Sequence, residues 1–513
     1  MWLESIAKRY GDQLALACDK DTLTYSQLLN ASWCCAIDLV RRGMKKGDRV
    51  ILMGINGLDW IISFFGIVLA GGVAALANYS LSSKDTTTLT QLVDAKWAVL
   101  VVDDIFGLRP EAVAQAIEMG GVSFNHILNG RKLYETASDP ASILDPATVQ
   151  ALSTLTKAQD TQKNIFTTGT TSKPKAVQLS SCGMLTNAFG SLKINGKDIG
   201  KAVCQALSMF HIFGLVNTLR MLENGCFICL PREISSESVL ELLERYKVDT
   251  LVSVGTVFRM LVELPEFKEK GEGKIKTCIW GASGITPTDV ERMQMCLGAV
   301  QILPGYGLSE CSCVVSTSSS DIPLERRMTT VGRLNPNQDV RIWMEDRGFL
   351  PQGEIGEIVV KGPCVMNGYL GIPREDQPID GDGWLHTGDL GVITEDGLLQ
   401  LKGRIKDLIK RAGENISPAE IEKALLEEPS ISDAKVMGIP HPVLGESVEA
   451  CVVLRDGELD ERKLRAALRK KLSPYKIPSH IFAFSALPQN ANGKLNQRLL
   501  KEMVLERLRE EYK

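Results

Sequence analysis

Hydroxyl, glycine and lysine residues crowd into the segment 166–177, which reads FTTGTTSKPKAV. An apolar run leads into it and predicts a strand, whereas Pro174 disfavours a helix beginning there. Hydroxyl and backbone N–H groups can bind phosphate oxygens, and a lysine can neutralise their charge. The segment is not a Walker loop, in which Gly-Lys-Ser/Thr opens a helix. By itself it is compatible with a phosphate-binding loop and with a surface turn rich in Thr and Ser.

Other segments of the chain carry further residue types that suit the binding of a nucleotide or an acid. Glycine and alanine let a ligand approach the backbone, aromatic rings stack on bases, and carboxylates bind Mg²⁺ and accept hydrogen bonds from hydroxyls. In chain order these segments read MFHIFG (209–214), WGASG (280–284), GYGLSE (305–310), GWLHTGD (383–389), GRIKDLIKRAGENI (403–416) and NANGKL (490–495).

With the phosphate loop, these segments resemble, in order and over essentially the whole chain, the superfamily of acyl-CoA synthetases, peptide-synthetase adenylation domains and luciferases. The family loop typically reads Thr-Ser-Gly-Thr-Thr-Gly-x-Pro-Lys-Gly, and this chain departs from it at Ser172 and Ala176. The resemblance favours the acyl-CoA ligase branch. It implies an AMP-forming acid–thiol ligase that uses ATP, Mg²⁺ and CoA, activates a fatty or aryl carboxylic acid as an acyl-adenylate and then transfers it to the CoA thiol.

The resemblance also implies a nucleotide site. Tyr306 would stack on adenine, Glu310 would hold Mg²⁺, and Asp389 would accept hydrogen bonds from both ribose hydroxyls. The residues expected to bind ATP are Thr167, Thr168, Gly169, Thr170, Thr171, Lys175, Gly281, Ala282, Ser283, Tyr306, Gly307, Ser309, Asp389 and Arg404.

The remaining roles follow from the same resemblance. The expected catalytic residues are Lys494, Lys410, Glu310 and His211; the expected CoA-binding residues are Lys410, Gly413 and Glu414; and the expected acyl pocket comprises His211, Thr256, Phe258, Trp280 and Gly305. Lys406 would be the pivot of a domain rotation. Trp280 stands where relatives commonly carry a small residue, so it either reshapes the acyl pocket or packs in the core. The basic run 404–411 is either a phosphate-attracting patch for CoA or a solvated helix face.

The length of 513 residues exceeds one ordinary hydrophobic core and predicts an α/β protein of at least two domains. Residues 1–403 should form a large domain of parallel and mixed sheets layered with helices, with a β-barrel-like subdomain. Residues 404–513 should form a small, mobile α+β domain. Helices are expected at 25–42, ended by Gly43, and at 461–472, and strands at 48–54 and 448–454. A capping box is expected at Ser417–Glu420.

Composition narrows the partners and the compartment. The net charge of −4 gives no bias towards nucleic acid or an anionic membrane. Residues 60–77 are apolar and uncharged, and a buried helix followed by a buried strand explains them better than a membrane span. The 13 cysteines are odd in number and irregularly spaced, which excludes a small disulfide scaffold. Cys226 and Cys229 form a CxxC within an apolar stretch, with no second CxxC or nearby His pair, so they are expected to be core thiols rather than zinc ligands. So many unpaired thiols suit a reducing environment, and a cytoplasmic location is expected.

Three alternatives stay open. A stand-alone adenylation enzyme would load a carrier protein instead of CoA. A luciferase-like oxygenase would share the motifs. A catalytically impaired nucleotide-binding protein is suggested by Ser172 and Ala176, which add side chains where the family has glycine.

Overall fold

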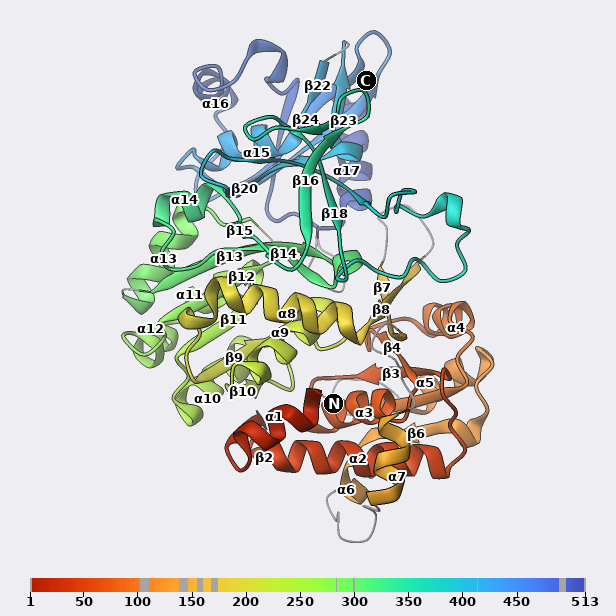
Figure 1. The fold of residues 1–513 in the computed structure, drawn as a ribbon. Coiled ribbons are helices and arrows are strands. Elements are labelled where there is room, and N and C mark those ends of the chain that lie inside the picture. Colours follow the sequence, from red (N-terminus) through yellow and green to blue (C-terminus); the bar gives the residue numbers. More distant parts are fainter. Residues whose placement is uncertain are drawn as a thin grey trace. The chain divides into compact units, whose positions relative to one another are not determined.

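The computed structural model describes residues 2–101, 110–137, 146–154, 160–167, 174–282, 284–298, 300–412, 414–488 and 495–511 (Figure 1). Contacts among its residues divide the chain into two compact units. Unit 1 comprises Met1–Val340 with Val360–Leu385, and unit 2 comprises Arg341–Val359 with His386–Lys513.

Two sheets form the scaffold of unit 1. Over its described residues, the larger sheet has nine strands, which in pairing order are β15 (Arg333–Leu334), β14 (Cys313–Thr317), β13 (Gln301–Leu308), β12 (Thr277–Gly281), β11 (Thr250–Val254), β9 (Ala202–Ala206), β10 (Phe227–Leu230), β1 (Leu14–Cys18) and β2 (Asp21–Thr24). The other sheet has six, namely β6 (Ile127–Asn129), β5 (Trp97–Val101), β3 (Arg49–Gly54), β4 (Val73–Ala77), β7 (Thr161–Thr167) and β8 (Lys175–Ser180).

Both sheets have parallel interiors and antiparallel margins. Strands β9 to β13, with β10 and β1, pair in parallel, as do β3 to β7, whereas β2, β14, β15 and β8 pair antiparallel. The interior strands β4 and β5 are buried along their whole length, as parallel strands covered on both faces should be. The predicted parallel and mixed sheets are confirmed, and so is the strand at 48–54.

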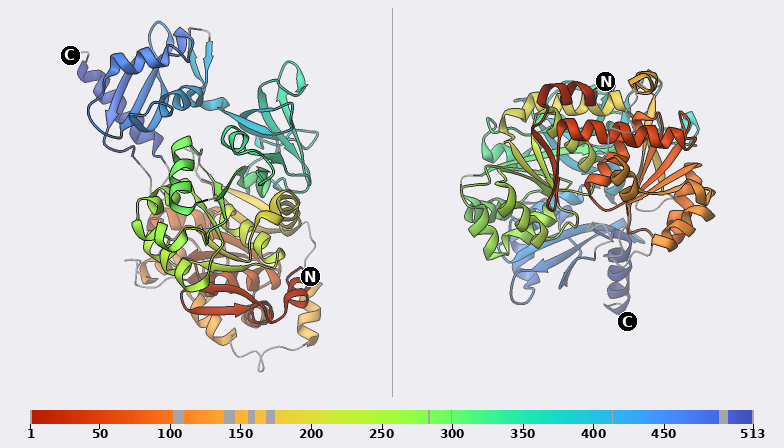
Figure 2. Two further views of the ribbon diagram at one scale, coloured as in Figure 1. Left: turned by 90° about the vertical axis from the view of Figure 1, so that its left-hand side faces the viewer. Right: turned by 90° about the horizontal axis from the view of Figure 1, so that it is seen from below.

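Helices cover these sheets. The helices of unit 1 are α1 (Trp2–Tyr10), α2 (Tyr25–Arg41), α3 (Leu58–Leu69), α4 (Ser83–Leu92), α5 (Pro110–Met119), α6 (Gly130–Ala137), α7 (Pro146–Ser153), α8 (Ser181–Asn195), α9 (Ile212–Glu223), α10 (Ser236–Tyr246), α11 (Gly255–Val262), α12 (Pro265–Gly271), α13 (Pro287–Leu297) and α14 (Leu324–Thr329). Apolar residues of α10 to α13 pack on one face of the larger sheet and form a continuous core with it. Helix α2 packs against α1 and α3, as the view from below in Figure 2 illustrates.

Helix α3 explains the apolar run at 60–77. It contacts β3 and β4 of one sheet and β1 and β2 of the other, so all sides of the helix are buried. Strand β4 follows it. The interpretation as a buried helix followed by a buried strand is therefore confirmed. Among the described residues, no helix is long and apolar enough to cross a membrane.

Helix α2 begins and ends as its sequence predicts. The Thr24 hydroxyl accepts from the Gln27 N–H and the Gln27 side chain accepts from the Thr24 N–H, which satisfies two exposed donors at the N-terminus. Gly43 follows the C-terminus with φ +103°, a conformation that glycine adopts without a Cβ clash.

Unit 2 holds two smaller sheets. One, the counterpart of the predicted barrel-like subdomain, has the order β17 (Gly348–Leu350), β16 (Asp339–Met344), β18 (Gly356–Lys361), β19 (Leu385–Ile393) and β20 (Leu399–Arg404). The other contains β22 (Glu414–Ile416), β21 (Ile409–Arg411), β24 (Gly445–Leu454), β23 (Ile431–His441) and β25 (His480–Phe484). Helices α15 (Pro418–Leu426) and α16 (Glu461–Leu468) pack on one face of the latter, and α17 (Gln497–Glu511) packs on the other.

Two local expectations in unit 2 are wrong. Pro418 does stand in the first turn of α15, but the Ser417 hydroxyl makes no cap hydrogen bond and instead donates to the Lys402 carbonyl oxygen at 2.6 Å. The predicted helix 461–472 ends earlier, at Leu468, because the chain turns at 469–471 before Pro474. The strand predicted at 448–454 lies within β24.

Candidate active site

The predicted phosphate loop joins two antiparallel strands. Thr167 ends β7 and Lys175 begins β8, and the two residues pair in register. This register brings the ends of the loop together, as in a hairpin. The loop residues Thr168, Gly169, Thr170 and Thr171 lie outside the described residues, and so do three other predicted site residues: Ser283, Gly413 and Lys494.

Lys175 and Glu310 both contact a third residue, Tyr369. The Tyr369 hydroxyl donates a 2.7 Å hydrogen bond to Glu310 Oε1, and the Lys175 ammonium lies 4.5 Å from the centroid of the Tyr369 ring. Glu310 stands in a short 3-10 turn, Ser309–Cys311, directly after β13. The structure thus brings the predicted phosphate lysine and the predicted metal ligand together on one aromatic side chain.

Glu310 fits the expected magnesium site. A Mg²⁺ ion bound with phosphates needs only one or two protein carboxylates, and it keeps several water ligands. A carboxylate has two acceptor oxygens, so Glu310 can accept from Tyr369 and still bind a cation. Among the described residues, no group of three or more His, Cys, Asp or Glu side chains could hold a metal without such a substrate.

The predicted adenine-binding strand is β13. Tyr306 pairs with Ser316 of β14, and the register shifts at the following residue, Gly307. A Cβ at Gly307 would lie 1.5 Å from the Cys313 carbonyl oxygen, so only glycine fits there. The half-buried Tyr306 side chain therefore lies next to a fixed bulge.

Two further motifs contact each other. A Cβ at Gly281 would lie 2.5 Å from the ring of Phe213, in the first turn of α9, so the ring covers the glycine. His211 precedes that helix, and its ring lies 4.4 Å from that of Phe210. Ala282 has φ +63°, a left-handed conformation that strains a residue with a Cβ. Backbone strain of this kind is often found at functional sites. The structure therefore joins the segments 209–214 and 280–282.

Of the five predicted acyl-pocket residues, Trp280 and Phe258 are buried, and His211, Thr256 and Gly305 are half-buried. Trp280 is 1% exposed and Phe258 is 0% exposed, and their rings stack at a centroid distance of 4.8 Å with 6° between their planes. Both belong to the core between the larger sheet and α10–α13. Thr256, in α11, and Gly305, in β13, are half-buried. Trp280 is thus a core-packing residue in this structure.

Unit 2 carries the predicted ribose-binding pair. Asp389 on β19 and Arg404 on β20 occupy paired positions, and Arg404 Nε lies 2.7 Å from Asp389 Oδ1. The loop before Asp389 is held by buried Glu357, which accepts from the Gly388 N–H at 2.8 Å and hydrogen-bonds His386 Nδ1 at 2.7 Å. The Thr387 hydroxyl donates to the Ile358 carbonyl oxygen.

The basic run 404–411 does not form a helix face, so that interpretation is wrong. It comprises the end of β20, the 3-10 turn Ile405–Asp407 and β21. Arg411 donates to the carbonyl oxygens of Tyr475 and Ile477, which occupies its guanidinium. Lys406 and Lys410 are exposed, as is Glu414 on β22.

The cysteines are free thiols, and most are buried. Burial raises the pKa of Cys226 to about 11 and raises that of Cys229 still further. A raised thiol pKa opposes metal binding, which requires the thiolate. The interpretation of this CxxC pair as core thiols is confirmed.

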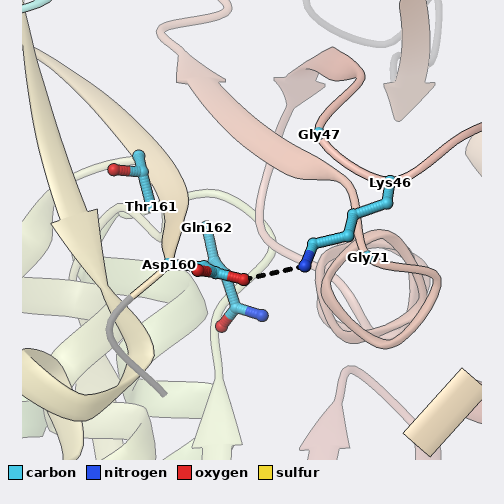
Figure 3. Close-up of a pocket in the computed structure, with 6 residues that line it drawn as sticks. All are labelled: Lys46, Gly47, Gly71, Asp160, Thr161 and Gln162. Atoms are coloured by element: carbon cyan, nitrogen blue, oxygen red, sulfur yellow. Dashed lines mark ion pairs between the residues drawn. The ribbon is translucent and has the colours of Figure 1, made fainter. Parts of the chain in front are cut away.

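A surface pocket of about 280 Å³ lies elsewhere in unit 1 (Figure 3). Its walls are the turns before β3 and β4 and the start of β7, and the Lys46 ammonium points across it to Asp160 at 3.1 Å. Its lining contains none of the predicted site residues.

Two residues that contact the site, Tyr369 and Glu357, are not predicted from the sequence. Tyr369 follows a glycine in a loop outside the motifs, and Glu357 is an ordinary residue of a strand. Their roles depend on contacts with distant segments, so only an aromatic residue after Asn367-Gly368 could have drawn attention to the first.

Comparisons with known proteins agree with this arrangement. The sequence matches the AMP-binding enzyme family over residues 3–370 and the AMP-binding enzyme C-terminal domain over residues 420–494. It is 30% identical to a long-chain-fatty-acid–CoA ligase of Bacillus subtilis (98% of this chain, 93% of the relative) and 31% identical to a 2-succinylbenzoate–CoA ligase of Bacillus cereus (98% of each).

A solved relative shares the fold. The o-succinylbenzoate CoA synthetase of Bacillus subtilis, in complex with its acyl-adenylate intermediate, superimposes with a TM-score of 0.81 at 26% identity, covering 98% of this chain and 97% of that one. The same enzyme has been solved with ATP and a magnesium ion. On the sequence matches over both regions and these relatives, the chain belongs to the family of AMP-binding enzymes.

Proposed function

We propose that the protein is a cytoplasmic, AMP-forming acyl-CoA ligase, which activates a hydrophobic fatty or aryl acid with ATP and transfers the acyl group to the thiol of CoA. The observation that carries this proposal is the convergence of Lys175 and Glu310 on Tyr369, in the part of the chain that matches the AMP-binding family.

The first half-reaction joins two anions. A carboxylate resists attack by a thiol, because it is negatively charged and would have to expel oxide. Attack of the carboxylate oxygen on the α-phosphorus of ATP forms the acyl-adenylate and releases pyrophosphate. Cationic groups must therefore meet the phosphates. Lys175 and Lys494 are the proposed residues, and Glu310 would hold Mg²⁺, which neutralises phosphate charge.

The nucleotide itself would be held by the residues named above. Tyr306 stacks on adenine beside the bulge at Gly307, and the small residues Gly281 and Ala282 let the nucleotide approach the backbone. The ribose hydroxyls donate to Asp389, with Arg404 beside it. The ion pair between these two side chains supports the assignment, since it fixes the carboxylate that would accept the hydrogen bonds.

The second half-reaction replaces AMP by the thiol of CoA. We assign the C-terminal part, 404–513, to alternating roles: it presents Lys494 for adenylation and then Lys410, Gly413 and Glu414 for thioester formation. Lys406 is the proposed pivot. Hinge motions of this kind commonly gate two steps at one centre.

The acid class follows from the pocket candidates. His211, Thr256, Phe258, Trp280 and Gly305 include no carboxylate, which an amino-acid substrate would need for its ammonium group. A fatty or aryl acid matches this apolar set. The relatives act, by their names, on long-chain fatty acids and 2-succinylbenzoate.

The decisive experiment is ATP–pyrophosphate exchange across a panel of fatty and aryl acids, repeated as thioester formation with CoA. Exchange together with CoA turnover is expected. Exchange without turnover would indicate a carrier-protein acceptor, and tight ATP binding without exchange for any acid would indicate a nucleotide-binding protein that has lost catalysis.

A further inference from the structure

Tyr369 is not one of the predicted site residues, but it contacts two of them, Glu310 and Lys175. Its hydroxyl donates to Glu310 Oε1 at 2.7 Å, and the face of its ring lies 4.5 Å from the Lys175 ammonium. A carboxylate and an ammonium thus meet two different parts of one side chain, the polar tip and the aromatic face. Because all three residues lie in unit 1, these contacts belong to one compact body.

The backbone holds Tyr369 in this place. The segment 367–370 runs beside β8. The Asn367 N–H donates to the Gln178 carbonyl oxygen at 2.9 Å, the Gln178 N–H donates to the Gly368 carbonyl oxygen at 3.0 Å, and the Leu370 N–H donates to the Ala176 carbonyl oxygen at 2.9 Å. Lys175 begins this strand, so the tyrosine and the lysine share one support.

The side chain of Gln377 also holds the backbone of Tyr369. The Gln377 amide accepts from the Tyr369 N–H at 2.8 Å and donates to the Tyr369 carbonyl oxygen at 3.0 Å. The Met366 N–H donates to the Glu310 carbonyl oxygen at 2.8 Å, which ties the same loop to the turn that carries the carboxylate. Three segments distant in the sequence are therefore fixed around one ring.

We propose that Tyr369 is the positioning residue of the nucleotide site, which orients the Glu310 carboxylate for Mg²⁺ through its hydroxyl and holds the Lys175 ammonium for phosphate through its ring. This inference rests on the proposed function. It assigns separate work to the hydroxyl and to the ring, so substitutions can separate them.

The physical basis of each half is distinct. A hydrogen bond on Oε1 fixes the rotation of the carboxylate and leaves its other oxygen to the cation. The ring attracts the ammonium through its quadrupole and keeps it near the loop.

The test measures ATP affinity by calorimetry, once with Mg²⁺ and once with EDTA, and needs no knowledge of the acid. Tyr369→Phe removes the hydroxyl and keeps the ring, so ATP affinity should fall about tenfold with Mg²⁺ and stay unchanged in EDTA. Tyr369→Leu removes both groups and should weaken ATP binding under both conditions. Tyr246→Phe is the matched control, because its hydroxyl donates to a backbone oxygen, that of Asp19, at 2.8 Å.

Two results would overturn the positioning role. One is a Tyr369→Phe protein whose Mg²⁺ effect equals that of the wild type and of Tyr246→Phe. The other is an equal loss of affinity with Mg²⁺ and with EDTA, which a general structural defect would cause. Failure of the proposed function is separate: it would appear as wild-type protein that binds ATP with Mg²⁺ but exchanges no pyrophosphate with any acid.

Discussion

The guanidinium of Arg404 and the carboxylate of Asp389 form a 2.7 Å ion pair across neighbouring strands, and the two partners differ greatly in exposure. The Asp389 side chain is 7% exposed and that of Arg404 is 51% exposed. Burial of a carboxylate is costly unless a cation or donors compensate it, whereas a half-exposed guanidinium keeps much of its hydration. Removing the arginine and removing the aspartate should therefore affect the stability of the protein to different extents.

Arg404→Leu should destabilise the protein more than Asp389→Asn. The first change leaves a buried carboxylate without its cation, and the second replaces the carboxylate by a neutral group of similar shape. We expect a melting temperature about 2–4 °C lower for Arg404→Leu than for Asp389→Asn, by calorimetry or fluorescence. In AMP titrations the order should reverse, with Asp389→Asn about 10- to 100-fold weaker than wild type, because a charged acceptor of two hydrogen bonds is lost.

Asp396→Asn is the control for this pair. Asp396 lies in the turn of the same hairpin, where it accepts a 2.5 Å hydrogen bond from the Thr394 hydroxyl. It should bind AMP like the wild type. Wild-type AMP affinity in Asp389→Asn would exclude Asp389 from the ribose site.

The Trp280–Phe258 stack allows two roles to be separated. Trp280→Ala leaves a cavity in the core of unit 1 and should cost about 3–5 kcal/mol of unfolding free energy. If Trp280 also limits the acyl pocket, the same change should shift acid preference in pyrophosphate exchange towards longer chains. Trp97→Ala, at another buried tryptophan (2% exposed), should destabilise without any shift in preference. An unchanged preference in Trp280→Ala would leave Trp280 as a packing residue alone.

Local signals explain what the sequence could predict. Helix α2 and strand β3 follow from apolar periodicity and from Gly43, which are properties of neighbouring residues. The capping box predicted at Ser417 does not form, because the Ser417 hydroxyl donates instead to the carbonyl oxygen of Lys402, 15 residues away. For the basic run 404–411, the sequence left a patch for CoA and a solvated helix face as alternatives. The helix face is excluded by the fold, in which Arg411 lies on a strand and donates to the carbonyl oxygen of Tyr475, 64 residues further along the chain.

In the candidate site, too, contacts between distant segments could not be predicted from the sequence. Motifs named most of its residues through resemblance, and their roles stay predictions. Sequence could not reveal that Glu310 and Lys175 share Tyr369, since β8, the turn after β13 and the loop before Gln377 meet only in the folded chain.

Lys163 should make stability depend on pH. It is 3% exposed, it donates to the Ser181 hydroxyl at 2.8 Å, and its ammonium lies 5.6 Å from the Phe64 ring centroid. Burial lowers the pKa of Lys163 to about 7 in the folded state. Between pH 7 and its ordinary pKa, the unfolded chain binds the extra proton, so Lys163 makes stability rise with pH, by up to about 1.4 kcal/mol per unit.

Lys163→Met removes this group and keeps much of its volume. We expect the variant to melt above the wild type at pH 7, with the advantage greatest at or below that pH and lost as pH approaches 10.5, the ordinary lysine value. Urea unfolding at several pH values measures it. A constant difference from pH 7 to 10 would show that Lys163 does not change protonation on unfolding.

The last prediction concerns the proposed pivot. Lys406 stands in an exposed 3-10 turn after β20, and the Ser417 hydroxyl reaches back across it to the Lys402 carbonyl. A rotation about Lys406 must change its φ and separate α15 from β20, against which it packs. Proline fixes φ near −65°, so Lys406→Pro should reduce thioester formation about tenfold or more while pyrophosphate exchange persists. Glu395→Pro, in the turn Thr394–Gly397, is the control, since proline is favoured at the second position of such a turn. Thioester formation at the wild-type rate in Lys406→Pro would exclude Lys406 as the pivot, because a fixed φ and a required rotation at the same residue are incompatible.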